Sequence, residues 1–135
     1  MKKLLSILCC SVILLTVSSC TKQYITPNPN KTIIRDLASS AWTLTDPINV
    51  GVSYQASIDV PIDNTSAQLD GVVVSISYDG GNTYEQVPEV YNNVSYSYTY
   101  NQGNVTLYAQ SPTGGLPSSV PDPITVKIVV VYSNP

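Results

Sequence analysis

The sequence predicts an all-β domain over residues 41–135, folded as an antiparallel β-sandwich. Apolar and polar residues alternate with a period of two in several short runs, which is typical of strands that bury one face. Glycine, proline and asparagine gather between these runs and predict tight turns. Only 11% of the residues are charged, against about 25% in ordinary domains, and serine, threonine, asparagine and ten tyrosines supply much of the polarity instead.

The first two strands that the pattern predicts lie before the middle of the domain. The alternation of residues 52–60 predicts a strand that ends at Pro61. Residues 71–78 predict a second strand, with valine, isoleucine and tyrosine on one face. The glycines of residues 79–82 permit positive φ and predict a turn, after which residues 83–87 return as the partner strand.

The second half of the domain predicts a further hairpin and a final strand. One face of the hairpin's first strand carries three tyrosines, Tyr96, Tyr98 and Tyr100. A turn at residues 101–104 leads into residues 105–109, and a polar loop over residues 111–123 follows. Residues 124–132 are apolar on both faces, so we expect their strand to be central or covered. About seven short strands with turns at this spacing predict an immunoglobulin-like sandwich.

Residues 1–19 have the layout of a signal peptide. Lys2 and Lys3 precede an apolar run from Leu4 to Val17, and small residues follow. The run is shorter than the roughly 20 apolar residues of a bilayer-spanning helix. A plain cleaved secretory peptide is one interpretation of this segment.

The segment Val17-Ser18-Ser19-Cys20 resembles the bacterial lipobox, which ends in an obligatory cysteine. The resemblance implies that the Cys20 thiol takes a diacylglyceryl group, that the chain is cleaved on the amino side of this residue, and that an N-acyl chain such as palmitate is added. Two or three acyl chains hold a protein far more firmly than one, since each buried methylene contributes about 0.8 kcal/mol. We therefore expect a lipid on Cys20 and no other cofactor.

We predict that residues 20–40 comprise the lipidated cysteine and a flexible tether. Pro27 and Pro29 favour an extended chain, and no helical or strand periodicity of apolar residues is sustained. Within this segment, residues 32–37 fit either a first strand or a single helical turn. No acidic cluster follows Cys20. Such a cluster resembles a surface-export tag of Bacteroidota lipoproteins, so its absence favours an outer-membrane lipoprotein that faces the periplasm over one on the cell surface.

The charge of the domain limits its partners. From Ala41 onward, Lys127 is the only cation, and eight carboxylates leave a net charge of −7. Such a domain repels nucleic acid and anionic lipid headgroups, so we expect membrane attachment through the lipid alone and no nucleic-acid partner. All three cysteines lie within the first twenty residues, which leaves a chain cleaved before Cys20 without an internal disulfide.

The residue types available for catalysis predict that the protein is not an enzyme. The chain has no histidine, which is the commonest general base and the usual ligand of catalytic zinc. Lys127 has no Ser-x-x-Lys motif beside it, and Glu85 and Glu89 form a carboxylate pair without any surrounding glycosidase signature. Two clusters of oxygen-bearing side chains could gather around calcium: Asp79 with Asn82, and Asp59 with Asp63 and Asn64. Neither cluster has the spacing of an EF-hand or of a calcium-binding repeat. We expect no metal site.

One short motif is specific. Residues 77–84 match the Asp-box pattern of sialidase-like propellers, with these residues at the defining positions: Ser77, Asp79, Gly81, Thr83 and Tyr84. The resemblance implies a structural hairpin, in which the Asp and Thr side chains bond backbone groups of the turn and the aromatic ring packs beneath. A propeller needs several blades of about 40 residues each, for which this chain has no room.

Tyr96, Tyr98 and Tyr100 have two interpretations. Rings on one face of a strand can pack as cross-strand pairs, or they can form a surface that stacks on sugars or contacts a protein. The sequence leaves both open.

Several strand segments together resemble the small cell-envelope lipoproteins of the Bacteroidota, which carry one β-sandwich behind a lipobox. The resemblance rests on Trp42, Tyr54–Pro61, Gly71–Val74, Val94–Tyr98, Gly103 and Val126–Val130. Some of these lipoproteins have collagen-like Gly-Pro repeats, which a short Pro/Asn tether replaces here. The resemblance implies a fold and a location but no agreed activity. We expect a non-catalytic lipoprotein whose sandwich contacts an envelope protein or a glycan, or, as the alternative, a glycan-binding accessory module that uses surface tyrosines.

Overall fold

The computed structural model describes residues 30–45 and 53–133. The predicted signal peptide, Cys20 and the first part of the tether lie outside these residues. Within the two described ranges, no helix is long and apolar enough to cross a membrane.

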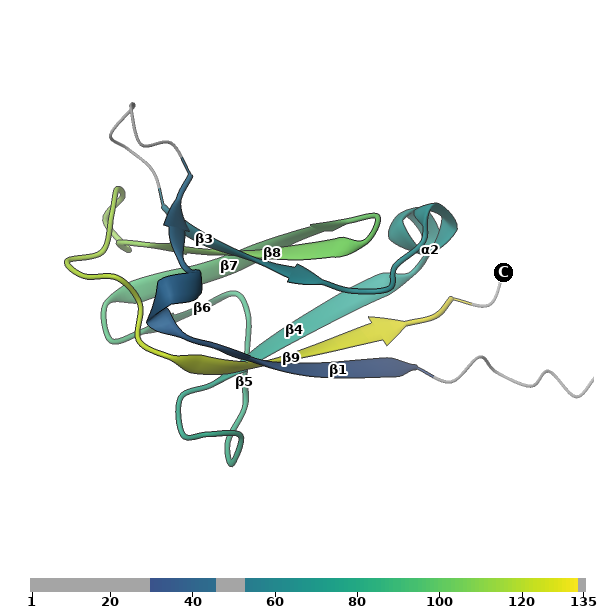
Figure 1. Ribbon diagram of the computed structural model, residues 1–135, viewed down its shortest axis with the longest axis horizontal. Helices are drawn as coiled ribbons and strands as arrows, with labels where there is room; N and C mark the ends of the chain where they lie inside the picture. The colour runs from purple at the N-terminus through teal and green to yellow at the C-terminus, as the bar shows by residue number, and fades with distance from the viewer. Residues whose placement is uncertain (1–29, 46–52, 134–135) are drawn as a thin grey trace, which may run out of the picture.

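Two antiparallel sheets face one another as a β-sandwich, which confirms the predicted fold (Figure 1). One sheet contains, in spatial order, β1 (Lys31–Leu37), β9 (Ile124–Val131), β4 (Gly71–Ser77) and β5 (Glu85–Gln86). The other contains β2 (Thr43–Leu44), β3 (Tyr54–Asp59), β8 (Asn104–Gln110), β7 (Val94–Asn101) and β6 (Glu89–Tyr91). The last two strands, β8 and β9, lie in opposite sheets, whereas those of an immunoglobulin sandwich are neighbours.

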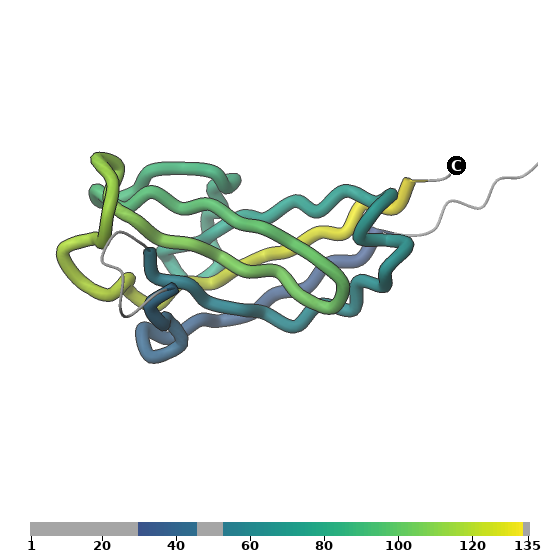
Figure 2. Tube along the Cα trace, turned by 90° about the horizontal axis from the view of Figure 1, so that it is seen from above, coloured from purple at the N-terminus to yellow at the C-terminus, as the bar shows by residue number. Residues whose placement is uncertain are grey.

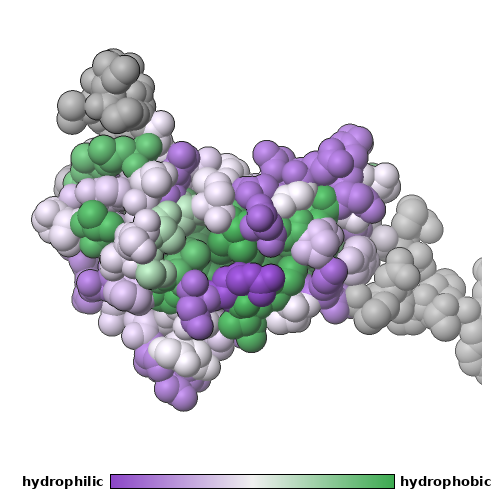
Figure 3. All heavy atoms as spheres, viewed as in Figure 1, coloured by the Kyte–Doolittle hydropathy of each residue, from purple (hydrophilic) through white to green (hydrophobic). Residues whose placement is uncertain are grey.

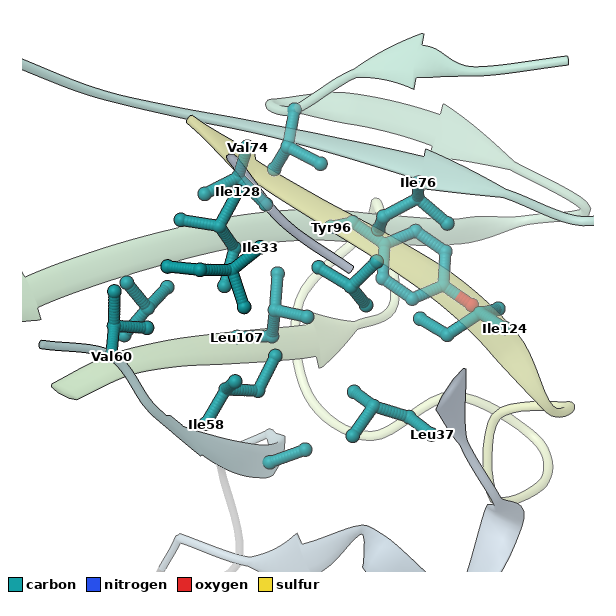
Figure 4. Close-up of a cluster of buried hydrophobic side chains, with 14 of the residues drawn as sticks. Ile33, Leu37, Ile58, Val60, Val74, Ile76, Tyr96, Leu107, Ile124 and Ile128 are labelled. Atoms are coloured by element: carbon teal, nitrogen blue, oxygen red, sulfur yellow. The ribbon is translucent and has the colours of Figure 1, made fainter. Parts of the chain in front are cut away.

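The core forms between the two sheets, where the apolar faces of their strands pack together. Alternate residues of β4 and β9 point inward and are buried, as Val74, Ile76 and Ile128 show in Figure 4. Leu107 of β8 and Ile58 of β3 face them from the other sheet. The β9 strand lies between β1 and β4, so its prediction as a central strand is confirmed.

The first strand corrects the predicted domain boundary. Residues 31–37, which fit either a strand or a helical turn, form β1 and pair along their whole length with β9. The tether predicted over residues 20–40 is therefore wrong at its end, because the sandwich begins at Lys31 and a short 3-10 helix, Ser39–Ala41, follows. The sequence pattern did not distinguish this strand from a tether, because β1 is an edge strand that buries only Ile33 and Leu37.

The sequence prediction also lacked β2, a helix and a hairpin. The helix α2 (Asn64–Leu69) spans six residues, and the Asp63 side chain caps it by accepting a hydrogen bond from the Ser66 amide at 2.7 Å. The hairpin is formed by β6 and β7, whose turn residues Asn92 and Asn93 have φ values of 47° and 62°. Asparagine tolerates this left-handed region, which a two-residue hairpin turn requires.

The two ends of the sandwich differ. The start of β1, the end of β9 and α2 lie at one end, while the 3-10 helix and the loop over residues 111–123 lie at the other (Figures 1 and 2). On the side seen in Figure 3, apolar surface is visible between polar side chains. There the edge of β1 and β3 leaves a groove of about 300 Å³, lined by Arg35, Asp36, Leu37, Ser57, Ile58 and Asp59.

Candidate functional site

A recess of about 240 Å³ opens at the other edge of the sandwich, where β5 ends one sheet and β6 ends the other. Its lining consists of Tyr78, Asp79, Thr83, Glu85 and Tyr91. The register explains how these residues meet. Glu85 lies opposite Ile76, and Tyr91 lies opposite Val94, so each side chain is on the inner face of its own sheet.

Two tyrosine rings form the wall of this recess. The rings of Tyr78 and Tyr91 stack with their centroids 3.7 Å apart and their planes within 8° of parallel. Tyr91 remains 36% exposed, so one aromatic face is available to solvent. Because Tyr78 directly follows β4 and Tyr91 ends β6, the stack joins the edges of the two sheets.

Glu89 is bound to one ring of the stack. The Tyr78 hydroxyl donates a hydrogen bond to Glu89 Oε1 at 2.7 Å. Partial burial raises the pKa of Glu89, and the neighbouring Glu85 raises it further, whereas the bond from Tyr78 acts in the opposite direction. Burial and the same bond raise the pKa of Tyr78, which keeps its hydroxyl protonated as the donor. Glu85 and Glu89, which no sequence signature joins, are thus neighbours.

The loop of residues 77–84 supports the recess through hydrogen bonds on Asp79. Asp79 Oδ1 accepts bonds from the Thr83 amide at 2.8 Å, the Asn82 amide at 3.0 Å and the Ser77 hydroxyl at 2.7 Å. The Ser77 hydroxyl oxygen in turn accepts a bond from the Gly81 amide at 2.8 Å. The bond from the Thr83 amide and that from Ser77 are the main causes that lower the pKa of Asp79 to about 2.

The aromatic residue of the Asp-box pattern lies on the outer face of the sheet. A side chain at Gly81 would come within 3.2 Å of the Tyr84 hydroxyl, so the ring packs closely against the turn, and Gly81 has a φ of 92°. The Lys127 ammonium lies over the Tyr84 ring, 3.8 Å from its centroid. The residues of the motif therefore build the turn, and Asp79 and Thr83 also face the recess.

The structure favours the packing interpretation for Tyr96 and Tyr98 over the contact interpretation. Tyr96 is only 3% exposed and packs near Trp42 and Tyr78, at centroid distances of 6.3 and 6.0 Å. Burial raises its pKa to about 12. The Tyr98 hydroxyl crosses the sandwich and donates a 2.6 Å bond to the carbonyl oxygen of Val72. Both rings face the core because their strand presents its serines and threonine to solvent instead.

Of the three tyrosines, Tyr100 alone is exposed at the surface, at 38%. It lies at the far end of β7 from the recess. The exposed aromatic ring beside the carboxylates belongs instead to Tyr91, which the sequence did not single out. The only signal that could have found it was the Asn92-Asn93 dipeptide, which predicts a hairpin turn directly after Tyr91.

Two of the three carboxylates considered for calcium, Asp79 and Asp63, have other roles. Asp79 Oδ1 is occupied by bonds of its own turn, and Asp63 caps α2. Within residues 30–45 and 53–133, no group of three His, Cys, Asp or Glu side chains is arranged to hold a metal ion.

The outer face of the larger sheet is a second surface rich in hydroxyl groups. Tyr108 lies at its centre, with Gln55 opposite on β3 and Ser97 opposite on β7. Hydroxyl contacts continue across the strands, at 3.3 Å between Thr99 and Tyr108 and at 3.3 Å between Ser57 and Thr106. This face is polar but largely without charge.

The fold and these surfaces define a small β-sandwich protein with a carboxylate- and tyrosine-lined recess at one edge. No protein-family model matches the chain, and no curated protein or solved structure is significantly similar to it.

Proposed function

We propose that this protein is a non-catalytic lipoprotein of the cell envelope, anchored by lipid on Cys20 to the outer membrane at its periplasmic face. Its sandwich makes contacts with another envelope component. The recess between β5 and β6 is the observation that carries the contact function, because it joins an exposed aromatic ring to the two carboxylates of Asp79 and Glu85. Aromatic side chains supply much of the energy at protein interfaces.

The direction of the chain fits an anchored domain. Residue 30 enters the sandwich at the end where α2 lies, so a lipid on Cys20 connects to that end of the domain (Figure 1). The recess lies along one edge of the sandwich, formed by strands that do not include β1. A partner can therefore approach the recess without displacing the strand that follows the tether.

Membrane fractionation tests the anchor. The wild-type chain should sediment with membranes and incorporate labelled palmitate, while Cys20→Ala should lose the label and leave the membrane pellet. Cys10→Ala is the matched control, since it removes a cysteine ahead of the lipobox-like segment and should change neither result. A Cys20→Ala protein that stays in the membrane pellet contradicts the anchor.

Affinity capture from detergent-solubilised membranes tests the contact function. The wild-type chain with its anchor intact should retain an envelope partner that Tyr91→Ala loses, because this change removes the exposed ring of the recess. Tyr100→Ala removes a ring of similar exposure at a distant position and should retain the partner. Equal capture by both variants contradicts a role for the recess.

The second candidate function is a glycan-binding accessory module. The observation in its favour is the hydroxyl-rich outer face around Tyr108, since stacking rings and uncharged hydrogen-bonding groups suit neutral sugars. A glycan-array signal that is lost in Tyr108→Ala, but kept in Tyr91→Ala, would support this function at the expense of the first.

A further inference from the structure

The recess presents hydrogen-bond acceptors and an aromatic face to a ligand, but few hydrogen-bond donors. Asp79, Glu85 and the adjacent Glu89 carry carboxylates, which in the ionised form accept hydrogen bonds and donate none. The Tyr78 hydroxyl already donates its hydrogen bond to Glu89. The lining includes no cation and no side-chain amide, and the donors it has left are the hydroxyls of Thr83 and Tyr91, so a ligand that brings positive charge and donors complements the carboxylates.

We propose that this recess binds the guanidinium group of an arginine side chain on a protein partner. The proposal rests on the proposed contact function and names the chemistry of that contact. A planar guanidinium carries five donors and a permanent charge, and it can form parallel bonds to a carboxylate while its face stacks on an aromatic ring. Glu85 and the exposed face of Tyr91 line the same recess and supply these two partners.

The aromatic wall favours a flat cation. Tyr78 holds Tyr91 from behind, with the two rings nearly parallel, so the position of the exposed ring is fixed before a ligand arrives. A cation over a tyrosine face is attracted by the ring electrons, and the attraction strengthens where water is partly excluded.

No cation of the domain occupies this role. Lys127 lies over Tyr84 on the opposite face of the sheet, and the other two cations of the sandwich, Lys31 and Arg35, belong to β1 at the opposite edge. Glu89 is partly buried beside Glu85, and two neighbouring carboxylates repel one another. An incoming guanidinium therefore removes a repulsion as well as forming new bonds.

The size of the recess also points to a side chain. Its volume of about 240 Å³ is smaller than the roughly 300–1,000 Å³ of pockets that enclose whole small molecules. It is open to solvent at the edge of the sandwich, so the rest of a partner chain can lie along β5 and β6.

The test uses the purified full-length protein in detergent micelles, followed by two-dimensional NMR. The probe is N-acetyl-arginine methylamide, and its neutral counterpart is the same compound made from citrulline, which has nearly the same shape without the charge. The arginine probe should shift the amides of Thr83, Glu85 and Tyr91, with a dissociation constant on the order of 1–10 mM, as expected for one side chain. The citrulline probe should shift them at least about fivefold less at equal concentration.

Variants locate the contact. Glu85→Gln should weaken arginine binding by about five- to tenfold, which is the effect of losing one charge-assisted bond. Glu89→Gln should weaken it less, because Glu89 neighbours Glu85 but does not line the recess. Asp59→Asn removes the same charge from β3 at the opposite edge and is the matched control, for which we expect less than a twofold change. Tyr91→Leu should weaken binding without unfolding the domain, since this ring is partly exposed.

Three outcomes overturn the proposal. Equal shifts with arginine and citrulline probes exclude recognition of charge. Equal weakening by Glu89→Gln, Glu85→Gln and Asp59→Asn reduces the effect to the general acidity of the domain. Shifts at these amides with cellobiose, but not with the arginine probe, make the recess a sugar site. Since the probes are used without a partner or a membrane, failure here is distinguishable from failure of the capture experiment.

Discussion

Neighbouring isoleucines in β1 provide the sharpest test of the domain boundary. Ile33 is 7% exposed and points into the core, while Ile34 is 51% exposed on the outer face of the same strand. Replacing either residue by alanine removes the same three carbon atoms and the same strand preference. The two variants should differ only because one side chain is buried.

The expected magnitudes follow from this burial. Removing three buried carbons from Ile33 costs about 2.4 kcal/mol at about 0.8 kcal/mol for each, and the cavity that remains brings the loss to about 2–4 kcal/mol. Ile34 is half exposed and leaves no closed cavity, so its loss should be about 1 kcal/mol or less.

Urea unfolding monitored by tryptophan fluorescence measures both variants. Trp42 is the only tryptophan in the chain and is buried in the core, so its emission reports loss of the sandwich. The unfolding midpoint of Ile33→Ala should fall well below that of Ile34→Ala, with similar slopes for both. Equal and small losses in the two variants would show that residues 31–37 belong to a tether after all, and would refute the reasoning.

Other parts of the sandwich allow further predictions. Tyr98→Phe removes the bond to the carbonyl oxygen of Val72 and should cost about 0.5–1.5 kcal/mol in urea unfolding. Asp79→Ala removes the acceptor of the loop, so hydrogen exchange at the Thr83 amide should accelerate while the core amides keep their protection. Glu89→Gln should stabilise the protein at neutral pH. Because folding raises the pKa of Glu89, wild-type stability is lost as the pH rises above the ordinary glutamate value of 4.5, and the variant should avoid this loss; a constant difference from pH 3 to 8 would contradict that cause.

The sequence predicted the strands that bury a full alternating face. Residues 71–78 became β4 with Val72, Val74 and Ile76 buried, and residues 124–132 became the central strand β9. The edge strands were not predicted, because they bury fewer side chains. Only Ile33 and Leu37 are buried in β1, and β6 spans three residues, so neither has enough alternation to be distinguished from a loop.

The recess could not be predicted, since its parts meet only through the arrangement of the two sheets. Glu85 and Glu89 are four residues apart in the sequence, but they belong to β5 and β6, which end different sheets. Alternation places side chains on one of two faces without saying which edges of the sandwich come together. For Tyr96, the same alternation predicted that its ring shares a strand face with Tyr98 and Tyr100. Only the packed structure identified that face as the interior.

The recess concentrates features that oppose folding in an otherwise simple sandwich. Glu89 keeps a partly buried carboxylate beside Glu85, although Tyr78 supplies only one hydrogen bond to it. A glutamine at position 89 would keep an acceptor for that bond without the charge, so the requirements of the fold do not explain the glutamate. Natural proteins keep such destabilising groups mainly where a ligand uses them. The repulsion between Glu89 and Glu85 therefore agrees with the geometry of the recess, in which a cation completes this edge of the sandwich.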